Sequence, residues 1–300
     1  MKTIPITLSQ IRFILAVAEE GSTAAAARQL NISQPSVSLA ISRVEDELGY
    51  PLFVRRPGLG MELTAQGARK LVELRAAYQN MSQIFSRCRD QNELAGSLSI
   101  GFMTTLGPVC VPRLVRKFQE LHPSVRIKLH EGNLSSLSNW LEIGRIESAI
   151  VYDFGLPTDL EILALQDVRP YGVVWQGHPL ADRESIAVQD LLRDPLILIN
   201  LPGSKEYFQS LLQSHETKAR IAFETESVEF LRSAVANRLG VGLLATDLPY
   251  DVTYDGGKVV RLPLNGYMSP HRVALARNPD FLETQALRAF RAVCLDEFTS

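Results

Sequence analysis

The chain has few of the residues that build catalytic, metal-binding or disulfide-bonded proteins. Its three cysteines, Cys88, Cys110 and Cys294, and its five histidines are scattered rather than set at metal-ligand spacing. It contains no phosphate-binding glycine loop and no G-x-S-x-G motif. No apolar run is long enough to span a membrane, and no secretory leader is recognisable. We therefore expect a cytoplasmic protein that is not an enzyme, with no cofactor, no bound metal and no membrane partner.

What is present starts with two short helices joined by a tight turn, in residues 22–49. Ser22 stands before an alanine-rich run, where its hydroxyl can cap a first helix. After the turn at Asn31, Ser33 can cap a second helix, and Pro35 falls in its first turn, where a missing N–H costs nothing. Gly49 stands where helices commonly end. The small alanines allow close crossing of the two helices, as a helix-turn-helix unit requires.

The second helix has two different faces. Val37, Ile41, Val44 and Leu48 recur at spacings of four, three and four, which predicts one buried stripe. The other face can donate, accept and make apolar contacts with base edges; it carries Gln34, Pro35, Ser38, Leu39, Ser42 and Arg43. These residues alone leave open an ordinary helical hairpin inside a globular core.

The flanking segments favour a DNA-binding domain. An apolar face that includes Leu8 and Leu15 predicts a preceding third helix. The segment PLFVRRPGLGMELT predicts a two-stranded hairpin, or wing, with Arg55 and Arg56 placed to meet phosphates. Two adjacent arginines can equally be solvated surface charge.

The order of LSQIRFILAVAEEGS, AAARQLNISQPSVSLAISRVEDELG, PLFVRR and LTAQG closely resembles the amino-terminal domain of LysR-type transcriptional regulators. The resemblance implies a winged helix-turn-helix whose helix enters the major groove while the wing meets the DNA backbone. The DNA-binding residues it implies are Ser33, Gln34, Pro35, Ser36, Ser38, Leu39, Ser42, Arg43, Arg55 and Arg56. Leu39 and Ser42 depart from the polar or basic side chains frequent in the family.

Charge is divided unevenly along the chain. Residues 1–92 hold 11 Lys+Arg against 8 Asp+Glu, a net of +3, whereas residues 93–300 hold 20 against 25, a net of −5. Only the first part therefore suits a polyanion. Because +3 is modest, tight binding should need two or more copies on adjacent half-sites.

Residues 65–92 supply a means of self-association. An apolar seam with alternating spacings of three and four runs along this segment and predicts a linker helix that pairs two subunits. The seam consists of Leu71, Leu74, Tyr78, Met81, Phe85 and Cys88. Alternatively, the stripe packs on the chain's own second body.

Residues 93–300 alternate short β-branched runs with helical patterns, which predicts an α/β body. The expected strands are SLSIGF, VRIKLH, SAIVYD, YGVVW, LILIN, RIAFET and VGLLAT, and the expected helices lie near 108–121, 134–143, 204–214, 228–239 and 280–297. The family resemblance implies two lobes like those of periplasmic binding proteins. Lobe I would comprise residues 93–163 and 268–300 and lobe II residues 166–266, joined by crossing strands near 161–169 and 260–268. No cysteine lies in 166–266, which argues against the cysteine-pair sensing of some family members.

In open α/β sheets, small molecules bind past the carboxyl ends of strands, where loops lead into helix N-termini. Hydroxyls and N–H groups at such junctions favour an anion, so we expect an effector with at least one acidic group, a carboxylate, between the lobes. The candidate effector-binding residues are Thr104, Thr105, Asn133, Asn200, Pro202, Gly203, Ser204, Ser227 and Thr246. Lys205 could add charge, and Phe102, Tyr152, Leu201 and Tyr207 could form apolar walls. Each junction can also be ordinary helix capping.

The sequence thus predicts a homodimeric or homotetrameric, effector-controlled regulator that binds double-stranded operator DNA, with RNA polymerase as a further expected partner. Two alternatives remain open at this point. An effector-independent DNA-organising protein would bind unrelated duplexes equally well, and a solute-binding protein would use the second body alone.

Overall fold

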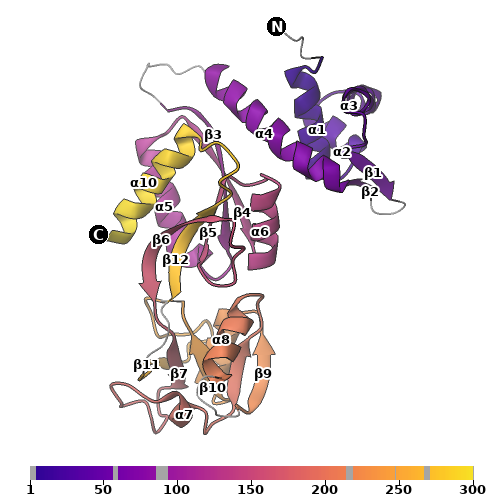
Figure 1. Ribbon diagram of the computed structural model, residues 1–300. Coiled ribbons are helices and arrows are strands. Elements are labelled where there is room, and N and C mark those ends of the chain that lie inside the picture. The colour runs from indigo at the N-terminus through magenta and orange to yellow at the C-terminus, as the bar shows by residue number, and fades with distance from the viewer. Residues whose placement is uncertain are drawn as a thin grey trace.

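The computed structural model describes residues 5–56, 60–85, 94–213, 219–246, 248–266 and 271–299. A helical first domain, a long helix and two α/β lobes succeed one another from the upper right to the bottom of Figure 1. The overall α/β class and this order of parts confirm the predicted architecture.

Three helices form most of the first domain: α1 (Leu8–Glu20), α2 (Thr23–Leu30) and α3 (Gln34–Leu48). The hydroxyls of Ser22 and Ser33 accept hydrogen bonds from the first turns of α2 and α3, as expected from the sequence. Asn31 and Gly49 end these two helices in the left-handed conformation, at φ 56° and 78°. The apolar stripe of α3 then packs against Ile14 of α1 in one buried core.

The wing is a two-stranded antiparallel hairpin made by β1 (Phe53–Arg56) and β2 (Gly60–Leu63). Its second strand is tied to the end of α1, because the Met61 N–H donates to the Gly21 carbonyl at 2.8 Å. A Cβ at Gly60 would overlap that same carbonyl oxygen, so the close approach requires glycine.

The long helix α4 (Ala65–Phe85) begins where the wing ends and lies beside α1. Leu71 is only 1% exposed and Leu74 is also buried, and both belong to the core of the first domain, with Tyr78 packed against it. Leu71 and Leu74, the first two positions of the predicted subunit-pairing seam, therefore pack against α1 of their own subunit. The partly exposed Met81 lies further along the helix. The Phe85 side chain and Cys88 lie outside what the structure describes.

Lobe I is built on a five-stranded sheet flanked by α5 (Gly107–Leu121), α6 (Leu134–Glu142) and α10 (Gln285–Thr299). Its strand order is β4 (Val125–Gly132), β3 (Gly96–Met103), β5 (Ser148–Tyr152), β12 (His271–Arg277) and β6 (Glu161–Val168). Strands β3, β4 and β5 are parallel, whereas β12 runs antiparallel to β5 and β6.

Lobe II repeats the plan with a second five-stranded sheet and the helices α7 (Val188–Leu191), α8 (Ser204–Gln213) and α9 (Val228–Ala236). Its strand order is β11 (Val259–Pro263), β7 (Tyr171–Trp175), β10 (Val241–Leu244), β8 (Leu196–Ile199) and β9 (Ile221–Thr225). Each lobe encloses its own buried apolar cluster, so each has a core that does not depend on the other.

All seven predicted strands are present, but β12 was not among the strands predicted from the sequence. Pairing of β6 with β12 places residues 166–168 in the sheet of lobe I, whereas the sequence reading assigned them to lobe II. The final helix begins at Gln285 rather than near 280. The differences at β12 and at residues 166–168 arise because β12 joins lobe I through antiparallel pairing with residues more than a hundred positions away.

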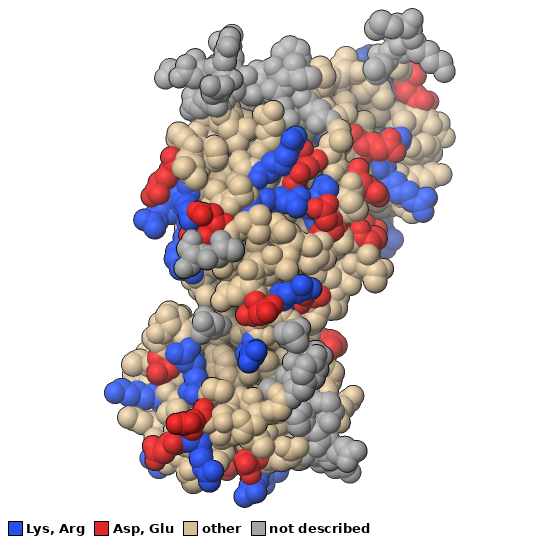
Figure 2. Space-filling model, turned by 60° about the vertical axis from the view of Figure 1, so that its left-hand side comes forward, with Lys and Arg blue, Asp and Glu red and all other residues tan. Residues whose placement is uncertain are grey.

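Positive and negative side chains are interspersed over the face shown in Figure 2, and the outline narrows between the two lobes. Among the described residues, no helix is both long and apolar enough to cross a lipid bilayer.

Candidate functional site: a recognition helix and an interlobe cavity

The polar face of α3 is exposed along its whole predicted length. Val37, Ala40, Ile41 and Val44 point into the core, which leaves the opposite side of the helix to solvent. The exposed residues are Ser33, Gln34, Pro35, Ser36, Ser38, Leu39, Ser42 and Arg43. Leu39 is 54% exposed, an unusual position for a large apolar side chain unless it meets another surface.

Three of these side chains are already held by neighbours. Gln34 Nε2 donates to Thr23 Oγ1 at 3.2 Å, so α2 orients the amide at the start of α3. The hydroxyls of Ser33 and Ser36 are 2.7 Å apart and share a hydrogen bond. The amide of Gln34 keeps its oxygen and one N–H for a base edge, such as that of adenine.

The two wing arginines differ in their environment. Arg56 is paired with Glu62 on the opposite strand at 2.7 Å, whereas Arg55 is exposed and has no ion-pair partner among the described residues. Glu45 of α3 accepts hydrogen bonds from the N–H groups of Leu52 and Phe53 at 2.7 and 3.1 Å. This carboxylate therefore anchors the wing to α3.

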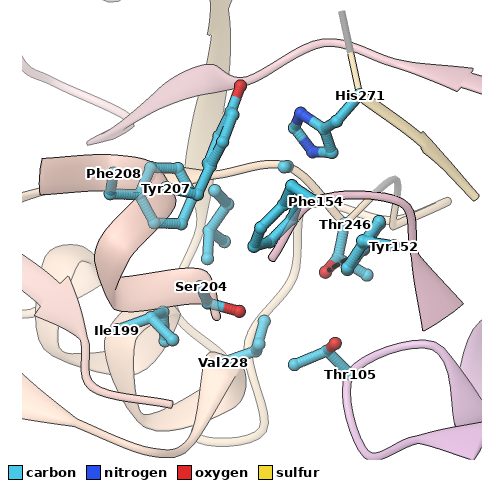
Figure 3. A pocket seen from close by; sticks show the side chains of 12 residues that line it. Thr105, Tyr152, Phe154, Ile199, Ser204, Tyr207, Phe208, Val228, Thr246 and His271 are labelled. Atoms are coloured by element: carbon cyan, nitrogen blue, oxygen red, sulfur yellow. Dashed lines mark hydrogen bonds between the residues drawn. The ribbon is translucent and has the colours of Figure 1, made fainter. Parts of the chain in front are cut away.

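A second candidate site is a small, partly open cavity between the lobes, which we call the interlobe cavity (Figure 3). Lobe I contributes Thr105, Tyr152, Phe154 and His271, and lobe II contributes Ile199, Ser204, Tyr207, Phe208, Val228 and Thr246. Thr105 and Tyr152 follow or end parallel strands, and Ser204 opens α8, so the cavity lies at the carboxyl edges of both sheets. The cavity volume open to the centre of a water molecule is about 20 Å³, which leaves room for one or two waters.

Aromatic rings from both lobes form one wall of the interlobe cavity. Phe154 of lobe I stacks on Tyr207 of lobe II with ring centres 5.0 Å apart, and on Tyr152 at 5.9 Å. The His271 ring stands edge-on to Tyr207, with ring centres 4.1 Å apart. Sequence reasoning missed Phe154 and His271, because only the position of β12 brings His271 to the cavity.

The lobes are also joined by a hydrogen bond. The hydroxyl oxygens of Tyr152 and Thr246 are 3.0 Å apart, and the Tyr171 hydroxyl donates to the Thr246 carbonyl at 2.7 Å. Tyr152 comes from lobe I and Thr246 follows β10 of lobe II, so this contact helps to hold the closed arrangement.

Several buried polar atoms of the interlobe cavity have no hydrogen-bond partner among the described residues. They are the Thr105 hydroxyl, the Tyr207 hydroxyl and both ring nitrogens of His271. Burial lowers the pKa of His271 to about 4, against a small opposing effect of Asp153, so the ring is neutral at pH 7. Burial also raises the pKa of Tyr207 to about 12. Because buried polar groups are normally paired, these atoms mark a place for a bound molecule.

Of the predicted effector-binding residues, Thr105, Ser204 and Thr246 line the interlobe cavity. Pro202 and Gly203 line a neighbouring surface groove, which we call the outer groove; it also includes Leu134, Phe154, Pro157 and Tyr207. The remaining candidates, Thr104, Asn133, Asn200 and Ser227, line neither. The Asn133 side chain caps α6 at 3.0 Å, and the Ser227 hydroxyl caps α9 at 3.1 Å. Asn133 and Ser227 therefore act as ordinary helix caps, the alternative given for these junctions in the sequence analysis.

The lining of the interlobe cavity itself offers no cation to the predicted acidic effector, although a larger adjoining pocket between the lobes includes Arg113 and Arg169. The cavity lining contains no lysine or arginine, and Lys205 Nζ is paired with Glu224 at 3.0 Å. At the start of α8 the Gly203 N–H already donates to the carboxylate of Glu206 at 2.6 Å. The N-termini of α6, α8 and α9 thus receive side-chain hydrogen bonds from the chain itself, whereas α5 has no side-chain cap.

Comparison with known proteins agrees with this division into two functional parts. Residues 8–68 match the family model described as bacterial regulatory helix-turn-helix protein, lysR family, and residues 91–299 match the LysR substrate binding domain. An uncharacterised HTH-type transcriptional regulator of Bacillus subtilis, YvbU, is 28% identical over 242 residues, covering 80% of this chain and 82% of the relative.

Solved structures show the same architecture over the full length. HinK, a LysR family transcriptional regulator from Pseudomonas aeruginosa, is 31% identical, with a TM-score of 0.66 and coverage of 98% of this chain and 99% of that one. A full-length OxyR variant from the same organism has a TM-score of 0.76 at 23% identity, covering 97% and 98% of the two chains, and shows the shared fold. The chain belongs to the family of LysR-type transcriptional regulators, with an amino-terminal DNA-binding domain and a carboxyl-terminal effector-binding domain.

Proposed function

We propose that α3 reads operator bases in the major groove while the wing contacts the DNA backbone. The exposed polar face of α3 carries this proposal, because a solvent-facing set of Gln34, Ser38, Leu39, Ser42 and Arg43 offers both hydrogen bonds and an apolar contact to base edges. Arg55 supplies a positive charge at the wing that no described carboxylate neutralises.

Two copies of the chain would place two such helices on a dyad-related operator. The net charge of +3 on residues 1–92 is too small for one copy to bind tightly, so paired half-sites provide the affinity. Pairing through α4 would use the part of the helix beyond Leu74, since Leu71 and Leu74 are buried in their own subunit. The proposal also includes contact between this DNA-bound assembly and RNA polymerase.

A small effector bound in the interlobe cavity would change the relative arrangement of the lobes. The Tyr152–Thr246 hydrogen bond and the Phe154–Tyr207 stack both cross from one lobe to the other, so a molecule that replaces them alters how the lobes meet. The effector must bind the two arrangements unequally in order to shift their populations. The altered lobes would then change the spacing or bending of the bound half-sites.

A gel-shift comparison tests this function directly. The full-length protein should bind the region upstream of its own gene far more tightly than an unrelated duplex of equal length, by a factor of roughly 10³ or more at physiological salt. Equal affinity for both duplexes would indicate the effector-independent DNA-organising alternative. Failure to bind either duplex even at low ionic strength would favour the solute-binding alternative.

A further inference from the structure

We propose that the interlobe cavity selects an uncharged, planar molecule with amide or ring-nitrogen hydrogen-bonding groups, in place of the carboxylate expected from the sequence. This inference rests on the proposed function, since it names the chemical class of the effector that would occupy the same cavity.

The electrostatics of the cavity oppose an anion. Its titratable groups are two tyrosines and His271, and the histidine is neutral at pH 7 because burial lowers its pKa. Asp153, the charged group that acts on the pKa of His271, is already paired: its Oδ2 accepts from Arg272 Nε at 2.7 Å. A buried carboxylate would lose its hydration without gaining a cation, which costs far more than burying an uncharged group.

The unpaired polar atoms of the cavity favour a neutral ligand that both donates and accepts. The neutral His271 ring offers one donor and one acceptor, whereas the hydroxyls of Thr105 and Tyr207 can each do either. In the view of Figure 3, the Thr105 and Ser204 hydroxyls lie on one side of the Phe154 ring and His271 with the Tyr207 hydroxyl on the other. A carboxylate only accepts, so it would leave a ring nitrogen of His271 unpaired, whereas a carboxamide or a nitrogen heterocycle can satisfy both kinds of atom.

The aromatic wall favours a flat ligand. Phe154 and Tyr207 are nearly parallel, with ring planes 29° apart, and the Tyr152 ring lies at 17° to that of Phe154. Phe154 and Tyr207 also line the outer groove, a surface volume of about 680 Å³ beside the 20 Å³ cavity. The stacked pair therefore separates the two spaces. Movement of one lobe would part these rings, join the spaces, and let a planar molecule enter between aromatic faces.

Matched probes of one shape and different charge test this assignment. Isothermal titration of the full-length protein at pH 7.5 would compare nicotinamide with nicotinate and benzamide with benzoate. Probes of this size should bind weakly, so concentrations up to about 20 mM are needed. We expect each amide to bind at least about tenfold more tightly than its carboxylate. Cyclohexanecarboxamide, which keeps the amide but is not planar, should bind more weakly than benzamide. Tighter binding of the carboxylates, or no binding of either amide, would overturn the proposal.

Two variants locate the binding in the cavity. His271→Phe keeps an aromatic ring and removes both nitrogens, and Thr105→Val keeps the shape and removes the hydroxyl; each should weaken nicotinamide binding about tenfold. His130→Phe, a change at another partly buried histidine of lobe I that packs on Trp140, is the matched control and should leave the affinity unaltered. Unaltered affinity in both cavity variants would refute the site. Operator gel shifts without probe distinguish failure of this inference from failure of the proposed function. If only the ligand class is wrong, the protein still prefers its operator; if the proposed function is wrong, it shows no such preference.

Discussion

Thr104 and Thr105 are adjacent and chemically identical, yet the structure gives them opposite environments. Thr104 is exposed, whereas the Thr105 hydroxyl is buried at the interlobe cavity and meets no hydrogen-bond partner in the part of the chain that the structure describes. His271 is 3% exposed and has no hydrogen-bond partner among the described residues, whereas the similarly buried His178 is paired with Asp194 at 3.1 Å. The role of a single residue therefore depends on its environment. A buried polar group without a partner costs free energy, so it favours a ligand that supplies the missing hydrogen bond.

Thr105→Val should raise the free energy of unfolding of the ligand-free protein by about 1 kcal/mol, because it removes a buried hydroxyl that lacks a partner. Thr104→Val, the matched control at an exposed position, should change it by less than about 0.5 kcal/mol. Chemical denaturation measures both values. A clear loss of stability in the Thr105 variant would show that its hydroxyl is satisfied, for example by a bound water.

His271 should make stability depend on pH in a defined window. Burial lowers its pKa from 6.5 to about 4 in the folded chain, so between these values the unfolded chain holds a proton that the folded chain lacks. The free energy of unfolding should therefore fall as the pH drops from 6.5 to 4, by a few kcal/mol at about 1.4 kcal/mol per pKa unit. Denaturation of the wild type and His271→Phe across this range provides the measurement. The slope due to His271 should vanish in the variant, and identical pH profiles would contradict the prediction.

At the scale of elements, α3 and the wing form one unit rather than two independent features. Glu45 of α3 accepts hydrogen bonds from the first strand of the wing, and β2 is tied to the end of α1. The recognition helix and the backbone-contacting hairpin are therefore held at a set angle, as reading a groove beside a phosphate backbone requires.

Gln34→Ala should weaken operator binding by about 1–3 kcal/mol and change binding to random duplex little, because the amide contacts a base edge. Arg55→Ala should weaken binding to both duplexes alike, because a phosphate contact carries no sequence information. Gel shifts on the two duplexes at one salt concentration give all four values. If Gln34→Ala weakened both duplexes equally, this residue would not be a base reader.

Gly67 fixes how α4 leaves the wing. A Cβ at this buried glycine would overlap the Leu52 carbonyl oxygen, which is backbone and cannot move aside cheaply. Gly67→Ala should lower the free energy of unfolding of the first domain by about 1–3 kcal/mol, as overpacking does. Thermal denaturation would compare it with Gly177→Ala, whose Cβ would meet no atom within 4 Å. Equal midpoints for the two variants would argue against this tight junction.

At the scale of the whole molecule, the division of α4 between subunit core and subunit partner decides how two copies meet. Its early apolar positions cover α1, and its later ones lie beyond the first domain in Figure 1. The interlobe cavity is built from residues far along the chain from α4. Effector binding must therefore reach the first domain as a change in the orientation of lobe I relative to that domain. Arg75 of α4 lies at that junction, because it pairs with Glu19 of α1 at 3.0 Å and lines the same pocket as Ser99 and Thr284 of lobe I.

Leu71→Ala should destabilise the first domain by about 2–5 kcal/mol, because Leu71 is buried in its own subunit. It should leave the association of folded subunits unaltered. Met81→Lys should do the reverse and shift the protein toward monomer, since it places a charge on the later part of the seam. Sedimentation velocity combined with thermal denaturation separates the two effects. Dissociation of a still folded Leu71→Ala protein would contradict this division of the helix.

Local patterns in the sequence were sufficient for the elements and for the recognition face. Caps at Ser22 and Ser33, the apolar spacing of α3 and the alternating strands of both lobes depend on neighbours within a few residues, where periodicity and hydrogen bonding act. The interlobe cavity could be predicted only in part, through Thr105, Ser204 and Thr246, because these residues follow or open regular elements.

The sequence by itself determined the order of helices and strands, the exposed side chains of α3 and the family of the chain, because short-range chemistry specifies them. Only the tertiary structure decided that β12 brings His271 against Phe154 and Tyr207, and that Asn133, Ser227 and Lys205 are already paired within the chain. The physical reason is that the burial and pairing of a polar group depend on residues that are distant in the chain and meet only when both lobes have folded.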